Sequence, residues 1–132
     1  MATTTASISI ASSDIIPGMA MNYYKTATLN KAGGCVGLEK IQSGTREYTS
    51  ASQVELLDES VVTTDKANKV YIKNLSTDAT EWIEVAMQAE VLGRLYAGDW
   101  MFIPWSAGSS NNIQVQPSVA SSMKLEYVLV HE

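Results

Sequence analysis

Residues 69–73 read Lys69-Val70-Tyr71-Ile72-Lys73, and their inward and outward positions alternate. A period of two is the pattern of a strand with one buried face, because successive side chains of a strand point to opposite sides. Val70 and Ile72 are therefore expected to face a core, and Lys69, Tyr71 and Lys73 to face away from it. The segment predicts a half-buried β-strand.

A second alternating segment occupies residues 80–87. The alternation places Trp82 on the same outer side as Glu84. A large aromatic beside a carboxylate on an outer face indicates a covered surface. The predicted inward residues are Ile83, Val85 and Met87.

Residues 100–105 are apolar on both faces, as expected of a strand that is covered on two sides. Pro104 lacks a backbone donor, which places it at the end of this strand or on a sheet edge. The final strand is predicted over residues 123–130. Its inward residues are Met123, Leu125, Tyr127 and Leu129.

Weaker strand patterns precede these segments, and residues 55–59 fit one helical turn equally well. Short strands separated by turn residues, without a convincing amphipathic helix, predict an all-β fold. We expect an antiparallel, jelly-roll-like β-sandwich that forms a single domain over residues 20–132. The weaker strand candidates are residues 21–29, 35–41, 46–50, 53–57 and 60–64.

Residues 1–19 differ in composition and are predicted to be an extended N-terminal arm. They are rich in Ser, Thr and Ala and alternate weakly at Ala6, Ile8 and Ile10. Such a segment cannot bury enough surface by itself to offset its ordering entropy. We therefore expect contacts outside its own domain, such as a neighbouring subunit, to hold it. An arm laid along its own sheet is the alternative.

Length and charge bound the possible functions. The chain has 132 residues, of which 45% are hydrophobic and 17% charged, and a formal net charge of −5. This length is that of one domain with its own core. No block of Lys or Arg is present to attract a phosphate backbone, so we expect no direct binding of nucleic acid.

Cysteine usage and hydropathy bear on the compartment. Cys35 is the only cysteine, so an intramolecular disulfide is excluded. The first ten residues lack the basic start and the apolar run of a secretion signal, and no stretch has the length of a membrane span. We expect a protein made in a cytoplasm, with no membrane partner.

Residues suited to catalysis or metal binding are scarce. His131 is the only histidine and lies at a terminus expected to fray, which disfavours a Ser-His-Asp or Cys-His site. One Cys and one His cannot supply the ligands of a zinc site. Asp58, Glu59 and Asp65 do not fit a calcium loop. We therefore predict no catalytic residue, no cofactor and no metal.

One acidic arrangement stays open at this point. Glu81, Glu84 and Glu126 would form a glycosidase-like pair if two of them faced one another across strands. Solvated sheet faces are the alternative explanation.

The aromatic residues are the most informative constellation. Exposed aromatic platforms stack against sugar rings, and aromatic residues also anchor protein interfaces. Core packing, a subunit interface and carbohydrate binding are all compatible with their positions. The set is Tyr71, Trp82, Tyr96, Trp100, Phe102 and Trp105.

The second half of the chain resembles small β-sandwich virion proteins of tailed bacteriophages. The resemblance lies in residues 69–74, in residues 93–104 with their Gly-Asp turn and apolar strand to Pro104, and in the ending Leu-Glu-Tyr strand of residues 125–132. It implies a non-enzymatic structural role in repeated copies. The family includes capsid cement or decoration proteins and components of the neck, tail and baseplate.

The resulting hypothesis is a capsid cement or decoration protein, located in the virion and assembled in the host cytoplasm. Its expected partners are the major capsid protein and copies of itself, with a trimer as one option. A tail, neck or baseplate component, a carbohydrate- or receptor-binding module and an enzyme are the alternatives. The candidate interface residues are Ile8, Ile10, Ile15, Ile16, Trp82, Trp100, Phe102 and Trp105.

Overall fold

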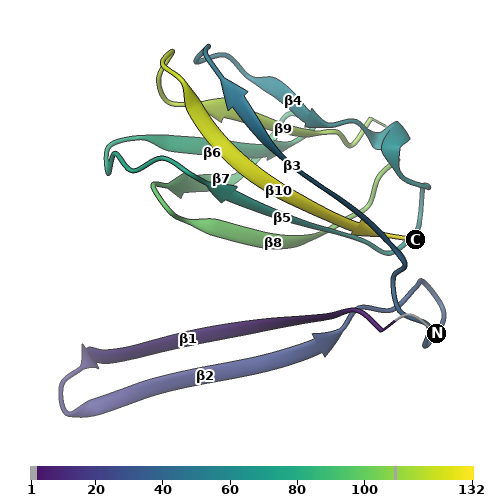
Figure 1. Cartoon of the computed structure of the whole chain (residues 1–132), viewed down its shortest axis with the longest axis horizontal. Coiled ribbons are helices and arrows are strands. Elements are labelled where there is room, and N and C mark those ends of the chain that lie inside the picture. The colour runs from purple at the N-terminus through teal and green to yellow at the C-terminus, as the bar shows by residue number, and fades with distance from the viewer. Residues whose placement is uncertain (1–2, 109) are drawn as a thin grey trace. The chain divides into compact units, whose positions relative to one another are not determined.

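The structure is a computed structural model that describes residues 3–108 and 110–132. Over this part of the chain it is all-β, with ten strands and one short 3-10 helix (Figure 1). The chain divides into two compact units, Met1–Glu39 and Lys40–Glu132.

The first unit is built on a β-hairpin formed by β1 (Thr5–Ile16) and β2 (Met19–Thr28), which pair antiparallel. Gly18 lies in the turn with φ of 78°, a conformation that favours glycine. The expected arm is therefore one strand of a hairpin, and the strand predicted over residues 21–29 lies in its partner strand as far as Thr28, outside the sandwich sheets. The two segments pair because a turn at Pro17-Gly18 joins them.

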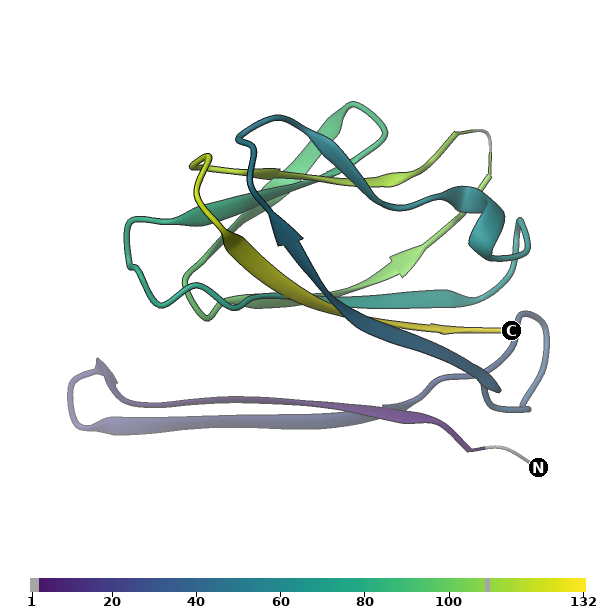
Figure 2. The same ribbon diagram turned by 45° about the horizontal axis from the view of Figure 1, so that its top comes forward.

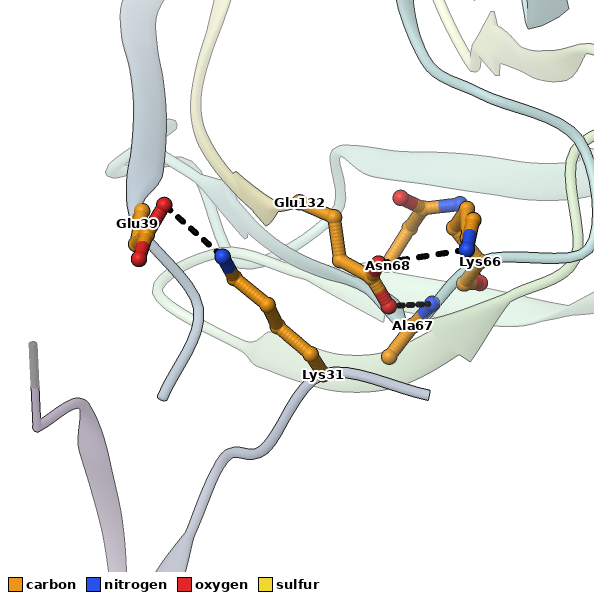
Figure 3. Close-up of polar contacts among 6 residues, drawn as sticks. All are labelled: Lys31, Glu39, Lys66, Ala67, Asn68 and Glu132. Atoms are coloured by element: carbon orange, nitrogen blue, oxygen red, sulfur yellow. Dashed lines mark hydrogen bonds and ion pairs between the residues drawn. The ribbon is translucent and has the colours of Figure 1, made fainter. Parts of the chain in front are cut away.

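Backbone hydrogen bonds organise the base of this hairpin. The Leu29 amide donates to the Thr4 carbonyl at 2.8 Å, and the Leu38 amide donates to the Leu29 carbonyl at 3.0 Å. The Lys31 ammonium lies 2.8 Å from the Glu39 carboxylate (Figure 3). The sequence predicts a strand over residues 35–41. Residues 35–39 instead lie in the loop that follows the hairpin, and the next strand begins at Lys40.

The second unit is a sandwich of two four-stranded antiparallel sheets within the described residues (Figure 2). One sheet has the order β3-β10-β5-β8 and the other the order β4-β9-β6-β7. This order is that of a jelly roll, so the predicted fold class is confirmed. The strands are β3 (Lys40–Tyr48), β4 (Val54–Leu57), β5 (Asn68–Asn74), β6 (Trp82–Met87), β7 (Glu90–Tyr96), β8 (Trp100–Trp105), β9 (Ile113–Pro117) and β10 (Met123–His131).

The core lies between the two sheets, and the residues that are predicted to face inward form part of it. Val70 and Ile72 of β5 are fully buried, as are Ile83 and Val85 of β6. Met87 is partly buried against the same core. The predicted inward face of the final strand is confirmed as well, since all its members are buried: Met123, Leu125, Tyr127 and Leu129.

Two predictions for the sandwich strands are wrong. Residues 60–64 do not form a strand, because the chain makes a 3-10 helix over Glu59–Val61, where Asp58 caps the Ser60 amide at 2.7 Å. Strand β8 is not covered on both faces, because Trp100, Phe102 and Pro104 stay exposed on its outer face. Pro104 lies on this edge strand, as expected for a residue that cannot donate to a ladder.

The boundary between the units also differs from the expected one. It falls between Glu39 and Lys40, whereas the composition indicated a boundary after residue 19. Composition identifies where the Ser- and Thr-rich segment ends, but it does not show that the next strand pairs with that segment.

Candidate functional site

The hairpin has one apolar face. Directly paired residues of an antiparallel ladder share a face, so Ile10 lies beside Tyr23 and Ile8 beside Lys25. Ile10 is 47% exposed and Tyr23 is 48% exposed. The Lys25 ammonium lies 5.9 Å from the centre of the Tyr23 ring. We call this surface the hairpin apolar face; it consists of Ala6, Ile8, Ile10, Met21, Tyr23 and Ala27.

The opposite face of the hairpin is polar and satisfied by its own hydrogen bonds. The Ser7 and Thr26 hydroxyls lie 2.8 Å apart, and the Tyr24 hydroxyl donates to Ser7 Oγ at 3.3 Å. Hydrogen bonds with Ser7 and Thr26 lower the pKa of Tyr24. The hairpin is therefore amphipathic, although every residue of β2 is exposed.

Two candidate residues of the hairpin cannot be placed in this way. Ile15 and Ile16 end β1, but their side chains lie outside the described residues.

The sandwich carries a second exposed apolar surface, on the outer side of the β3-β10-β5-β8 sheet. Phe102 pairs with Tyr71, which pairs with Val128, so these three side chains form a row across the sheet. Trp100 stacks at a tilt on Tyr71, with ring centres 6.1 Å apart. We call this surface the aromatic face; it consists of Ile41, Tyr71, Trp100, Phe102, Val128 and Val130.

The exposed fractions of its side chains support the aromatic face as a surface patch. Ile41 is 72% exposed, Trp100 47% and Phe102 37%. Burial by its neighbours raises the pKa of Tyr71, and the adjacent Glu126 carboxylate adds to the effect. The Tyr71 hydroxyl donates to Glu126 at 3.4 Å, so the one polar tip in the row is partnered within the sheet.

The remaining candidate tryptophans have other roles. The Arg94 guanidinium lies 4.0 Å above the centre of the Trp82 ring, and its Nε donates to Glu84 at 3.0 Å. Trp82 is thus half-buried under a side chain of its own sheet. Trp105 is 1% exposed and its Nε1 donates to the Asn111 carbonyl at 2.7 Å. As a core residue, Trp105 has no surface to offer an interface.

A cleft of about 460 Å³ lies between the open edges β3 and β4. The Tyr48 hydroxyl is buried there without a hydrogen-bond partner among the described atoms, and burial raises the pKa of Tyr48. Its carboxylates are engaged with structural partners: Glu47 with the Ser122 hydroxyl, Glu55 with the Asn112 amide and Asp58 with the Ser60 amide. The Asn112 amide also donates to the second Asp58 oxygen at 3.5 Å, so Glu55 and Asp58 share this donor.

The geometry separates one of the glutamate pairs that the sequence offered, Glu84 with Glu126. Glu84 lies on the outer side of the β4-β9-β6-β7 sheet, and Glu126 lies on the outer side of the opposite sheet. Glu81 accepts a hydrogen bond from the Ser76 hydroxyl. Glu84 and Glu126 therefore face away from one another across the sandwich.

The C-terminal strand is anchored and not frayed. His131 pairs with Lys40 in the sheet, and the Glu132 carboxylate accepts the Ala67 amide at 3.1 Å and lies 3.7 Å from the Lys66 ammonium (Figure 3). The expected fraying is therefore wrong, because the strand pairs along its full length.

Metal binding and membrane spanning each require a particular arrangement of residues. Among residues 3–108 and 110–132, which the structure describes, no group of three or more His, Cys, Asp or Glu side chains is placed to hold a metal ion. No helix in the same ranges is long and apolar enough to cross a membrane.

Sequence inspection missed Met21, Tyr23 and Ile41 as surface candidates. For Met21 and Tyr23 a usable signal exists, because Pro17-Gly18 between two alternating segments is a hairpin signature. For Ile41 none exists, since its exposure depends on the position of β3 at a sheet edge.

Comparison with known proteins identifies no family. No protein-family model matches the chain, and no curated protein matches it. A mitogen from Yersinia pseudotuberculosis aligns over 70% of this chain and 86% of its own, at 9% identity and a TM-score of 0.45. The Cnp3 cupin domain of Schizosaccharomyces pombe aligns over 94% of this chain and 88% of its own, at 11% identity and a TM-score of 0.47.

Proposed function

We propose that this protein is a non-enzymatic structural component of a bacteriophage virion, a capsid cement or decoration protein that stabilises the shell through subunit contacts. The observation that carries the proposal is the amphipathic hairpin, whose second strand is exposed at every residue. An isolated two-stranded hairpin is marginally stable in water. A partner that covers its apolar face would stabilise it.

The aromatic face supports the same role. It offers Trp100 and Phe102 as exposed anchors on a rigid sheet, and aromatic residues are enriched among the residues that dominate binding energy at interfaces. A decoration protein needs many modest contacts summed over a closed array, since area alone converts poorly to affinity. Two separate apolar surfaces on one small chain meet this requirement.

The resemblance of the second half to phage virion proteins supplies the biological setting of the proposal. The partners are then the major capsid protein and copies of this chain, and the location is the virion. The fold by itself does not support this choice, because jelly rolls serve many functions.

Quantitative mass spectrometry of purified virions of the encoding phage tests the proposal. Hundreds of copies per particle are expected for a cement protein. Tens of copies or fewer would indicate a neck or baseplate component, and absence from the particle would overturn a virion role. A tail-tube subunit would also be abundant, so its location is read from electron micrographs of particles labelled with an antibody.

A carbohydrate-binding role has weaker support. The rings of Tyr71 and Trp100 are inclined by 33°, so they do not present one flat platform to a sugar ring. Quenching of tryptophan fluorescence by a sugar, or a hit on a glycan array, would favour that role over assembly.

A further inference from the structure

We propose that two copies of this chain exchange hairpins, with the hairpin apolar face of each copy packed on the aromatic face of the other. This inference rests on the proposed structural role and names its partner and its surface. It joins the two exposed apolar surfaces that the chain presents.

Of the two surfaces, the hairpin apolar face is the one that depends more on a partner. Its larger apolar side chains project from a ribbon of only two strands and stay between 37% and 48% exposed, and Met19 near the tip reaches 62%. Water contact with these side chains is unfavourable, and burial against another apolar surface removes it. The polar face already satisfies its hydroxyls internally through Ser7, Tyr24 and Thr26.

The aromatic face is a suitable acceptor because an uncharged row crosses all four strands of its sheet. Register pairs place Ser43 beside Val128, Val128 beside Tyr71 and Tyr71 beside Phe102. The lysines of β5 flank this row at Lys69 and Lys73, and do not interrupt it. Lys69, Lys73 and Glu126 lie at the margins of the row, and Lys25 shares the hairpin face that covers it.

Area favours reciprocal exchange over contact between two hairpins. The hairpin apolar face runs from Met21 to Ala27, seven residues that span about 24 Å, and a two-stranded ribbon is about 10 Å wide, so one face offers about 240 Å². Two hairpins face to face would bury about 480 Å² in total, which is within the range of a crystal contact. Reciprocal exchange involves four such faces and buries about 1,000 Å², which is above most crystal contacts.

Wild-type protein tests the exchange first. Sedimentation velocity is expected to show a concentration-dependent oligomer. Equal amounts of isotopically light and heavy protein are then mixed and treated with a lysine cross-linker. Links from Lys25 to Lys69 or Lys73 are expected between light and heavy copies; a monomer at all concentrations, or links only within one copy, would overturn the proposal.

Matched variants identify the two surfaces. Ile10→Lys and Phe102→Lys are each expected to weaken self-association by about tenfold or more. Ser9→Lys, on the polar face of the hairpin, and Tyr96→Lys, an exposed aromatic on the other sheet, are expected to leave it unchanged. If Phe102→Lys associates like wild type while Ile10→Lys does not, the contact joins two hairpins and the proposal fails.

A mixing experiment separates loss of contact from loss of folding. Ile10→Lys keeps an intact aromatic face and Phe102→Lys keeps an intact hairpin, so a mixture restores one of the two contacts and is expected to recover partial association. Neither variant alone can do so, and a mixture that stays monomeric while both circular dichroism spectra match wild type would contradict the exchange. A monomer that still enters virions would refute the exchange but not the virion role.

Discussion

Ile10 of β1 lies directly opposite Tyr23 of β2, on the same exposed face of the hairpin. The pairing places an aliphatic side chain beside an aromatic one, a combination that stabilises antiparallel strands. It also concentrates apolar surface on one side of a ribbon that has no third strand. Stability of the hairpin and the proposed contact with a second copy thus depend on the same side chains.

The turn of the hairpin gives a first prediction. Gly18→Ala places a Cβ where no atom lies within 4 Å, so the only penalty is the positive φ of 78°, about 1–2 kcal/mol. Amide hydrogen exchange in β1 and β2 is expected to accelerate, with the melting temperature of the sandwich unchanged. Gly34→Ala, at a position without positive φ, is the control and is expected to leave the exchange unaltered.

The core gives a second prediction. Ile72→Ala removes a fully buried side chain at the centre of the sandwich and is expected to lower the free energy of unfolding by about 2–5 kcal/mol. Urea denaturation measures this change. Trp100→Ala, on an exposed face, is expected to change stability much less in the monomer, and an equal loss would show that Trp100 packs in the core.

Asn74 gives a third prediction because it is buried and links the two sheets. Its Nδ2 donates to the Leu95 carbonyl of β7 at 3.0 Å, and its Oδ1 accepts the Ser76 amide at 2.9 Å. Asn74→Ala leaves both groups without this partner and is expected to lower the free energy of unfolding by about 1–3 kcal/mol per lost partner. Exposed Asn22→Ala serves as the control, and equal stability of the two variants would contradict the structural role of Asn74.

His131 gives a prediction about pH. Burial lowers its pKa below the ordinary value of 6.5, with a smaller contribution from Lys40. The folded protein therefore binds the proton less readily than the unfolded chain, so this residue destabilises the fold as pH falls below about 6.5. The melting temperature of wild type is expected to fall more steeply from pH 7 to pH 5 than that of His131→Gln; parallel curves would show that His131 does not contribute.

Individual residues show which features of the fold could be predicted from the sequence. Val70 and Ile72 alternate with Lys69, Tyr71 and Lys73 and are buried as predicted, because successive side chains of a strand point to opposite faces. For residues 100–105 the sequence predicts cover on both faces, but Trp100 and Phe102 are exposed. Coverage depends on what packs against the face of a sheet, which a local pattern does not state.

What the amino-acid sequence determined by itself is local: the alternating strands of the second half of the chain and their inward and outward positions. Tertiary structure decided which strands lie at edges, that Trp105 is buried while Trp100 is exposed, and that the N-terminal arm pairs with the strand after it. The physical reason is that side-chain alternation is set within a few residues of chain. Pairing and burial depend on partners far away in sequence, so only the assembled sheets reveal them.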